Sequence, residues 1–75
     1  MPRTHLKSAS LQAVAYLDLQ ALLELEFRSG SVYHYFDVST ETYKDLPRAE
    51  SKGTYFNRHI RHRFAYAKIR REERE

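Results

Sequence analysis

The feature that most constrains the fold is a two-residue alternation of apolar and charged side chains in the first half of the chain. Leu23, Leu25 and Phe27 are separated from one another by Glu24 and Glu26. In an extended strand successive side chains point to opposite faces, so this spacing places the apolar residues on one side. It predicts a half-buried antiparallel strand with both glutamates on its solvent side.

The residues on either side of this strand predict two neighbouring strands. Ser29-Gly30-Ser31 contains a glycine that can adopt the positive φ of a tight hairpin, and an apolar run from Val32 to Phe36 follows it. An earlier strand, about Leu11 to Tyr16, turns near Asp18. Together the three segments predict a small antiparallel meander.

Helical signals follow Val38. Ser39 or Thr40 can cap a first helix, and Pro47 limits its length or kinks it. A second helix is expected to begin at Ser51. On a helical wheel Phe56 and the residues that share its apolar face, Gly53 and Ile60, lie within about 60°, whereas a basic set falls at about 140° to 240°. That basic set comprises Arg58, Arg61 and His62.

The sequence therefore predicts an α+β fold, in which about three antiparallel strands are covered by one or two C-terminal helices. Phe64, Tyr66 and Ile69 indicate a short final strand. The expected domain covers residues 8–69, between a flexible N-terminus at 1–7 and a charged, flexible tail at 70–75. With 75 residues and no Cys, the core must rely on its ten aromatic side chains.

Charge is segregated along the chain. From Ser51 to Arg71 there are seven Lys or Arg and no acidic residue, whereas Ser8 to Glu50 holds three basic and seven acidic residues. A cluster of like charge attracts oppositely charged molecules, and guanidinium groups suit phosphates. The sequence predicts a nucleic-acid-binding surface composed of Lys52, Arg58, Arg61, His62, Arg63, Lys68, Arg70 and Arg71.

The expected partner is RNA, either tRNA or a single strand. The alternative is an acidic protein that docks on the same cations, and composition does not separate the two. A monomer is favoured. No run of residues is long and apolar enough to span a bilayer, and Met1 to His5 lack the apolar core of a secretory signal, so a cytoplasmic protein is expected.

Two smaller sites are candidates within this scheme. Tyr33 and Tyr35 share a strand face and are candidates for stacking on bases, although packing in the core is the favoured alternative. The helix start at Ser51, Lys52, Gly53 and Thr54 is a candidate anion site, because exposed N–H groups there bind anions. For Gly53 itself, close helix packing is the favoured interpretation.

Other chemistries are not indicated. His59 and His62 are two candidate metal ligands, which is fewer than a site needs. No nucleophile stands beside a base, and no glycine-rich phosphate loop is present. The sequence therefore predicts a protein that is not an enzyme, with no metal and no cofactor.

The chain resembles the KTSC domain. The segments that carry this resemblance are Phe27-Arg28-Ser29-Gly30, Tyr33-His34-Tyr35, Ser51-Lys52-Gly53, Tyr55-Phe56-Asn57 and Ile60. The match extends over about Ser8 to Ile69 and departs from the family where Val38-Ser39 replaces a Val-Pro pair and where Pro47 lies late in the first helix. KTSC domains occur at the C-terminus of some lysyl-tRNA synthetases and as stand-alone bacterial proteins. The resemblance implies RNA binding by way of the synthetase context.

Overall fold

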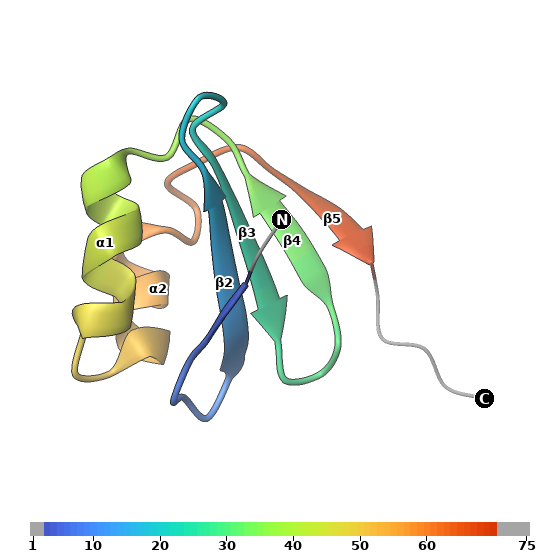
Figure 1. Cartoon of the computed structure of the whole chain (residues 1–75). Helices are drawn as coiled ribbons and strands as arrows, with labels where there is room; N and C mark the ends of the chain where they lie inside the picture. Colours follow the sequence, from blue (N-terminus) through green and yellow to red (C-terminus); the bar gives the residue numbers. More distant parts are fainter. Residues whose placement is uncertain (1–2, 71–75) are drawn as a thin grey trace.

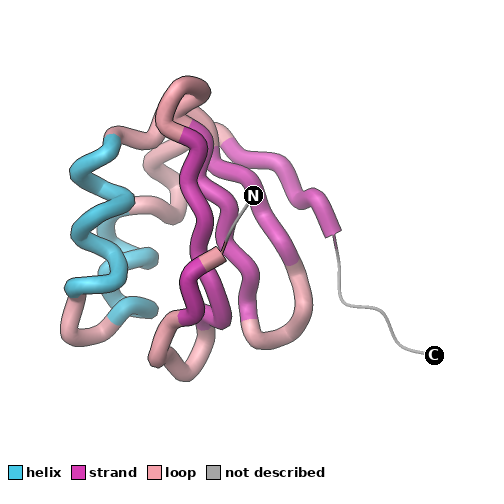
Figure 2. Tube along the Cα trace, viewed as in Figure 1, coloured by secondary structure: helices cyan, strands magenta, loops and turns pink. Residues whose placement is uncertain are grey.

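A five-stranded antiparallel sheet forms one layer of the domain, and two helices cover one of its faces (Figures 1 and 2). The computed structural model describes residues 3–70. The strands lie in the order β1-β2-β3-β4-β5, so each pairs with its neighbours in sequence. In chain order the elements are β1 Thr4–His5, β2 Leu11–Leu17, β3 Leu22–Phe27, β4 Val32–Tyr35, α1 Thr40–Arg48, α2 Lys52–His59 and β5 Tyr66–Arg70.

The α+β class is confirmed, but the sheet has more strands than the meander of about three. The expected final strand is present as β5, which pairs with β4 so that Tyr66 lies opposite Tyr35 and Lys68 lies opposite Tyr33. At the other edge β1 pairs with β2 through Thr4 and His5. The sequence prediction had placed residues 1–7 outside the folded domain. A two-residue strand leaves no periodic pattern by which it could be recognised.

The register of the central strands builds the core beneath the helices. Leu25 on β3 lies between Val14 on β2 and Tyr33 on β4, so these side chains share the helix-facing side. Phe56 on α2 and Ile60, which caps the end of α2, complete this core. The apolar helix face predicted around Phe56 is therefore present.

Local signals explain the turn and the helix starts. Gly30 has φ 98°, the conformation that favours glycine, and the Phe27 N–H donates to the Ser31 carbonyl at 2.9 Å to close the hairpin. The Ser39 hydroxyl accepts from the Thr42 N–H at 3.2 Å and so caps α1, which ends one residue after Pro47. The short first helix expected from Pro47 is therefore observed.

Aromatic contacts attach α1 to the sheet. Tyr16 on β2 stacks on Tyr43 with ring centroids 4.7 Å apart, and its hydroxyl donates to the Val38 carbonyl at 2.6 Å. On α2, Tyr55 donates from its hydroxyl to the Thr42 carbonyl at 3.2 Å. These bonds orient the two helices as a unit above the sheet.

The glutamate Glu24 does not lie on a solvated face, as the alternation had predicted, but is only 7% exposed. Its carboxylate accepts from Arg3 Nε at 2.6 Å and lies 2.8 Å from His34 Nε2. Arg3 also contacts Glu26, at 2.9 Å. The N-terminal segment thus returns over the strand face opposite the helices, a long-range contact that a local pattern does not report.

Glu24→Gln should destabilise the domain in a pH-dependent way. Burial raises the pKa of the Glu24 carboxyl, but hydrogen bonds and charges from His34 and Arg3 outweigh burial and lower it below 4.5. A carboxyl whose pKa is lowered by folding stabilises the fold at every pH above its pKa in the unfolded chain. That stabilisation is lost as the pH falls through the pKa of the carboxyl in the folded protein. At pH 7 the substitution should cost about 1.5–3 kcal/mol, the range for a hydrogen bond to a charged group.

Urea unfolding between pH 7 and pH 3 tests this expectation. The difference between the native protein and Glu24→Gln should shrink as pH falls below 4.5. Glu50→Gln, at an exposed position, is the charge-matched control and should stay near the native value. A pH-independent difference would show that the carboxylate charge of Glu24 is not what stabilises the fold.

Candidate functional site

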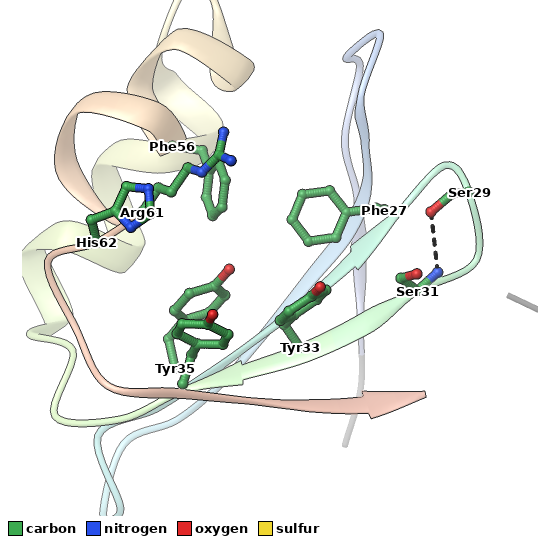
Figure 3. A pocket seen from close by; sticks show the side chains of 9 residues that line it. Phe27, Ser29, Ser31, Tyr33, Tyr35, Phe56, Arg61 and His62 are labelled. Carbon is green, nitrogen blue, oxygen red and sulfur yellow. Dashed lines mark hydrogen bonds between the residues drawn. The ribbon is translucent and has the colours of Figure 1, made fainter. Parts of the chain in front are cut away.

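A pocket of about 400 Å³ lies on the helix-covered face of the sheet, between strands β4 and β5 and the turn that follows α2 (Figure 3). Its walls come from four separate parts of the chain: the β3–β4 hairpin, β4, the end of α2 with the following turn, and β5. The residues that line it are Phe27, Ser29, Ser31, Tyr33, Tyr35, Phe56, Arg61, His62 and Tyr66. No acidic side chain is among these lining residues, all of which lie within the part of the chain that the structure describes.

Three tyrosines form one side of the pocket. The rings of Tyr33 and Tyr35 are nearly parallel, with centroids 6.2 Å apart, and Tyr66 lies 5.8 Å from each of them. Tyr35 is 4% exposed and belongs to the core, whereas Tyr66 is 58% exposed. The favoured packing role thus holds for Tyr35, Tyr33 is half-buried, and Tyr66 presents its ring to solvent.

Two phenylalanines join the tyrosines to the helix layer. Phe56 on α2 meets Phe27 edge-to-face at 5.4 Å and Tyr35 edge-to-face at 5.8 Å. Edge-to-face contacts are favourable because the positive edge of one ring meets the negative face of the other. Phe56 therefore fixes the spacing between α2 and β4 and, with it, the width of the pocket.

Cationic side chains reach this aromatic cluster from two directions. Lys68 Nζ on β5 lies over the ring of Tyr33, 5.5 Å from its centroid. Arg61 lies near enough to Tyr35 to affect its ionisation: burial and the neighbouring tyrosines raise the pKa of Tyr35 to about 12, and Arg61 opposes that rise. Tyr35 is thus a neutral phenol at physiological pH. It adds no negative charge that would offset the positive charge of the pocket.

The structure corrects the helical-wheel prediction that Arg58, Arg61 and His62 share one helix face. The helix ends at His59, and the N–H groups of Ile60 and Arg61 both donate to the Phe56 carbonyl, at 3.0 and 2.8 Å. His62 then takes a left-handed φ of 64°, which reverses the chain. Histidine adopts this conformation more readily than most residues that have a Cβ.

This turn separates the predicted basic residues. Arg61 and His62 line the pocket, while Arg58 and Arg63 are exposed and do not line it. Arg70 is the last residue of β5, within the predicted tail, and Arg71 lies outside the described residues. Within residues 3–70, no acidic side chain forms an ion pair with Arg58, Arg61, Arg63 or Lys68.

The predicted anion site lies at the other end of α2. The Ser51 hydroxyl is used within the helix cap, where it accepts from the Thr54 N–H at 3.3 Å and donates to the Thr54 hydroxyl at 2.9 Å. Lys52 Nζ donates to the Ala49 carbonyl at 3.0 Å. Eight helical residues span about 12 Å, which separates these groups from the turn after α2, and none of them lines the aromatic pocket.

Gly53 allows α2 to approach the start of β2 closely. A Cβ at this position would lie 3.1 Å from the Ser10 hydroxyl oxygen, which is tighter than ordinary contact. A shallow hollow of about 280 Å³ adjoins this contact and includes both Lys52 and Glu50. The close-packing interpretation of Gly53 is therefore supported by the geometry, and the hollow carries both signs of charge.

Sequence reasoning had not assigned Phe27, Phe56, Tyr66, Ser29 or Ser31 to a site. Phe56 was recognised as a packing residue and Tyr66 as part of a final strand, but their meeting depends on how β5 pairs with β4. The available signal was the spacing of Tyr66 and Lys68, which places both on one strand face. Because β5 pairs with β4, Tyr66 and Lys68 lie on the same side of the sheet as Tyr33 and Tyr35.

Two further observations limit the chemistry of the described residues. No three His, Asp or Glu side chains within residues 3–70 are grouped as a metal ion requires. No helix in the described part of the chain is both long and apolar enough to cross a membrane.

Comparison with known proteins identifies related chains. The family model for the KTSC domain matches residues 7–64. An uncharacterised protein of Stutzerimonas stutzeri is 42% identical over 57 residues, which cover 76% of this chain and 80% of that protein. A lysine–tRNA ligase of a Nostoc species is 39% identical over 59 residues, which cover 79% of this chain but 10% of the ligase. The chain thus matches only a small part of the ligase.

A solved structure supports the fold assignment. The crystal structure of a KTSC domain protein from Yersinia pestis superposes with a TM-score of 0.88 at 28% identity, and the match covers 92% of this chain and 97% of the other. The similarity therefore extends over nearly the whole of both molecules.

Proposed function

The chain belongs to the KTSC domain family, and from that premise we propose that it is a non-catalytic RNA-binding domain. The observation that carries this proposal is a pocket of aromatic rings that Arg61 lines, with Lys68 over one of the rings, that of Tyr33. RNA has the complementary chemistry, since its phosphates attract cations and its unpaired bases stack on aromatic side chains.

The basic surface is proposed to comprise the pocket cations and their exposed neighbours. Arg61 and Lys68 would contact phosphates beside the pocket, and Arg58 and Arg63 would add charge around the turn. Because the four cations have no acidic partner within residues 3–70, no ion pair there must break before they bind phosphate. Lys52 is not included, since its amino group is bonded at the far end of α2.

The relatives favour RNA among polyanions. Lysine–tRNA ligases of Nostoc species carry a segment similar to this chain. Their name gives tRNA as their substrate. The ligase activity itself belongs to the rest of those proteins, because the chain matches about a tenth of their length. We assign no reaction to this domain, and we place its action in the cytoplasm, where tRNA is found.

Fluorescence anisotropy with a labelled single-stranded RNA of about twelve nucleotides tests the proposal. Binding should saturate at 50 mM salt, and log Kd should rise with log salt concentration by about 0.7 for each phosphate contacted. Unlabelled tRNA and duplex DNA serve as competitors, together with an acidic peptide for the alternative protein-docking role. Absence of saturable RNA binding at low salt, with capture of the acidic peptide, would favour that alternative.

A further inference from the structure

We infer that the aromatic pocket holds one unpaired nucleotide of an RNA strand, with its base against Tyr66 and its phosphate beside Arg61 and Lys68. This inference rests on the proposed function and extends it, since it names the ligand unit and the residue that stacks on it. The cavity of about 400 Å³ is within the range of pockets that accept small organic molecules.

The ring geometry selects the stacking surface. A base that is sandwiched between two rings requires the rings to be about 7 Å apart, which is twice a normal contact distance. The ring centroids of Tyr33 and Tyr35 are only 6.2 Å apart, so a base does not fit between them. Lys68 already occupies a face of Tyr33. Tyr66 lines the same pocket and is 58% exposed, so its ring can receive a base without displacing the core.

The charge of the pocket selects among aromatic ligands. A cluster of aromatic rings can also enclose an ammonium group, such as a methylated lysine. Here Arg61 lines the pocket and Lys68 lies over the Tyr33 ring, and no acidic residue lines the cavity, so a cation would be repelled. The ligand chemistry that fits these side chains combines a flat ring with a negative charge, as a nucleotide does.

The hairpin end of the pocket adds polar groups. Ser29 and Ser31 line it there, and the Ser29 hydroxyl accepts from the Ser31 N–H at 3.4 Å. Serine hydroxyls both donate and accept, so they can bond to base edges of more than one type. This arrangement suits bases of more than one type, so no strong sequence preference is expected. Unpaired bases are favoured over paired ones, because taking a base out of a duplex has an energetic cost.

The test uses nuclear magnetic resonance with adenosine 5′-monophosphate as the probe. The nucleotide should produce saturable amide shifts at Tyr33, Arg61 and Tyr66. Ribose 5-phosphate and adenosine, which lack the base and the phosphate respectively, should each bind at least about tenfold more weakly if both groups contribute. Equal binding of the nucleotide and ribose 5-phosphate would overturn the base pocket.

Tyr66→Leu supplies the matched variant, because it keeps an apolar side chain on β5 but removes the ring. Its nucleotide affinity should fall about fivefold or more, the lower end of what base–aromatic stacking supplies. The control is Phe36→Leu, which removes a 39% exposed ring that does not line the pocket. Equal affinities for the two variants would exclude Tyr66 as the stacking residue.

Three further outcomes separate this inference from the proposed function. If the labelled RNA strand binds but Tyr66→Leu binds it as tightly as Phe36→Leu, the base pocket is rejected and RNA binding stands. If the RNA strand does not bind at all, both are rejected. If a peptide rich in Glu with one Phe shifts the pocket amides and the nucleotide does not, the pocket serves an acidic protein.

Discussion

Phe56→Ala should lower the free energy of unfolding by about 3–5 kcal/mol, the usual cost of removing a buried aromatic ring. Phe56 is 8% exposed and packs edge-to-face on both Phe27 and Tyr35. The total stability expected for a domain of this size is only about 4–11 kcal/mol. The variant should therefore lose about a quarter or more of the stability of the domain.

Urea unfolding followed by circular dichroism measures this loss. Asn57→Ala is the matched control, because Asn57 is the next residue on α2, is exposed and accepts only a long hydrogen bond from Arg61, at 3.4 Å. Its effect should stay within about 0.5 kcal/mol. A loss below about 1 kcal/mol for Phe56→Ala would mean that α2 does not depend on this ring for its attachment to the sheet.

The double variant Arg61→Gln/Lys68→Gln should weaken binding of single-stranded RNA roughly 100-fold at low salt, from about a tenfold loss for each charged contact. The slope of log Kd against log salt should fall by about 1.4, which corresponds to two phosphates. Neither side chain belongs to the buried core, so the folded structure should persist. Anisotropy at several salt concentrations gives both quantities.

A charge-matched control distinguishes local contact from net charge. Lys44→Gln/Arg48→Gln removes the same two charges from exposed positions on α1, away from the residues that line the pocket. It should weaken binding no more than about threefold, the effect of a general change in potential. Equal losses for the two double variants would contradict a site at Arg61 and Lys68.

The sequence was sufficient for the central strands because their signals are local. The alternation around Leu25 and the glycine at the hairpin are readable within a few residues, and φ 98° at Gly30 agrees with that interpretation. The packing role of Phe56 was likewise readable from helical spacing. These predictions require no knowledge of which segments meet.

The parts that could not be predicted depend on contacts between distant segments. The Glu24 carboxylate accepts a hydrogen bond from Arg3, which is 21 residues away in the sequence, so strand alternation alone placed this carboxylate in solvent. Arg61 faces the pocket because the helix ends two residues before it and His62 turns the chain. Tyr66 joins the site only through the pairing of β5 with β4.

The most direct test of RNA binding at this site is an amide shift map of the protein titrated with a short single-stranded RNA at near-physiological salt. The account predicts saturable shifts centred on Tyr33, Arg61 and Tyr66, with α1 and the start of α2 unchanged. Absence of shifts, or shifts centred on Lys52 at the other end of α2, would contradict it.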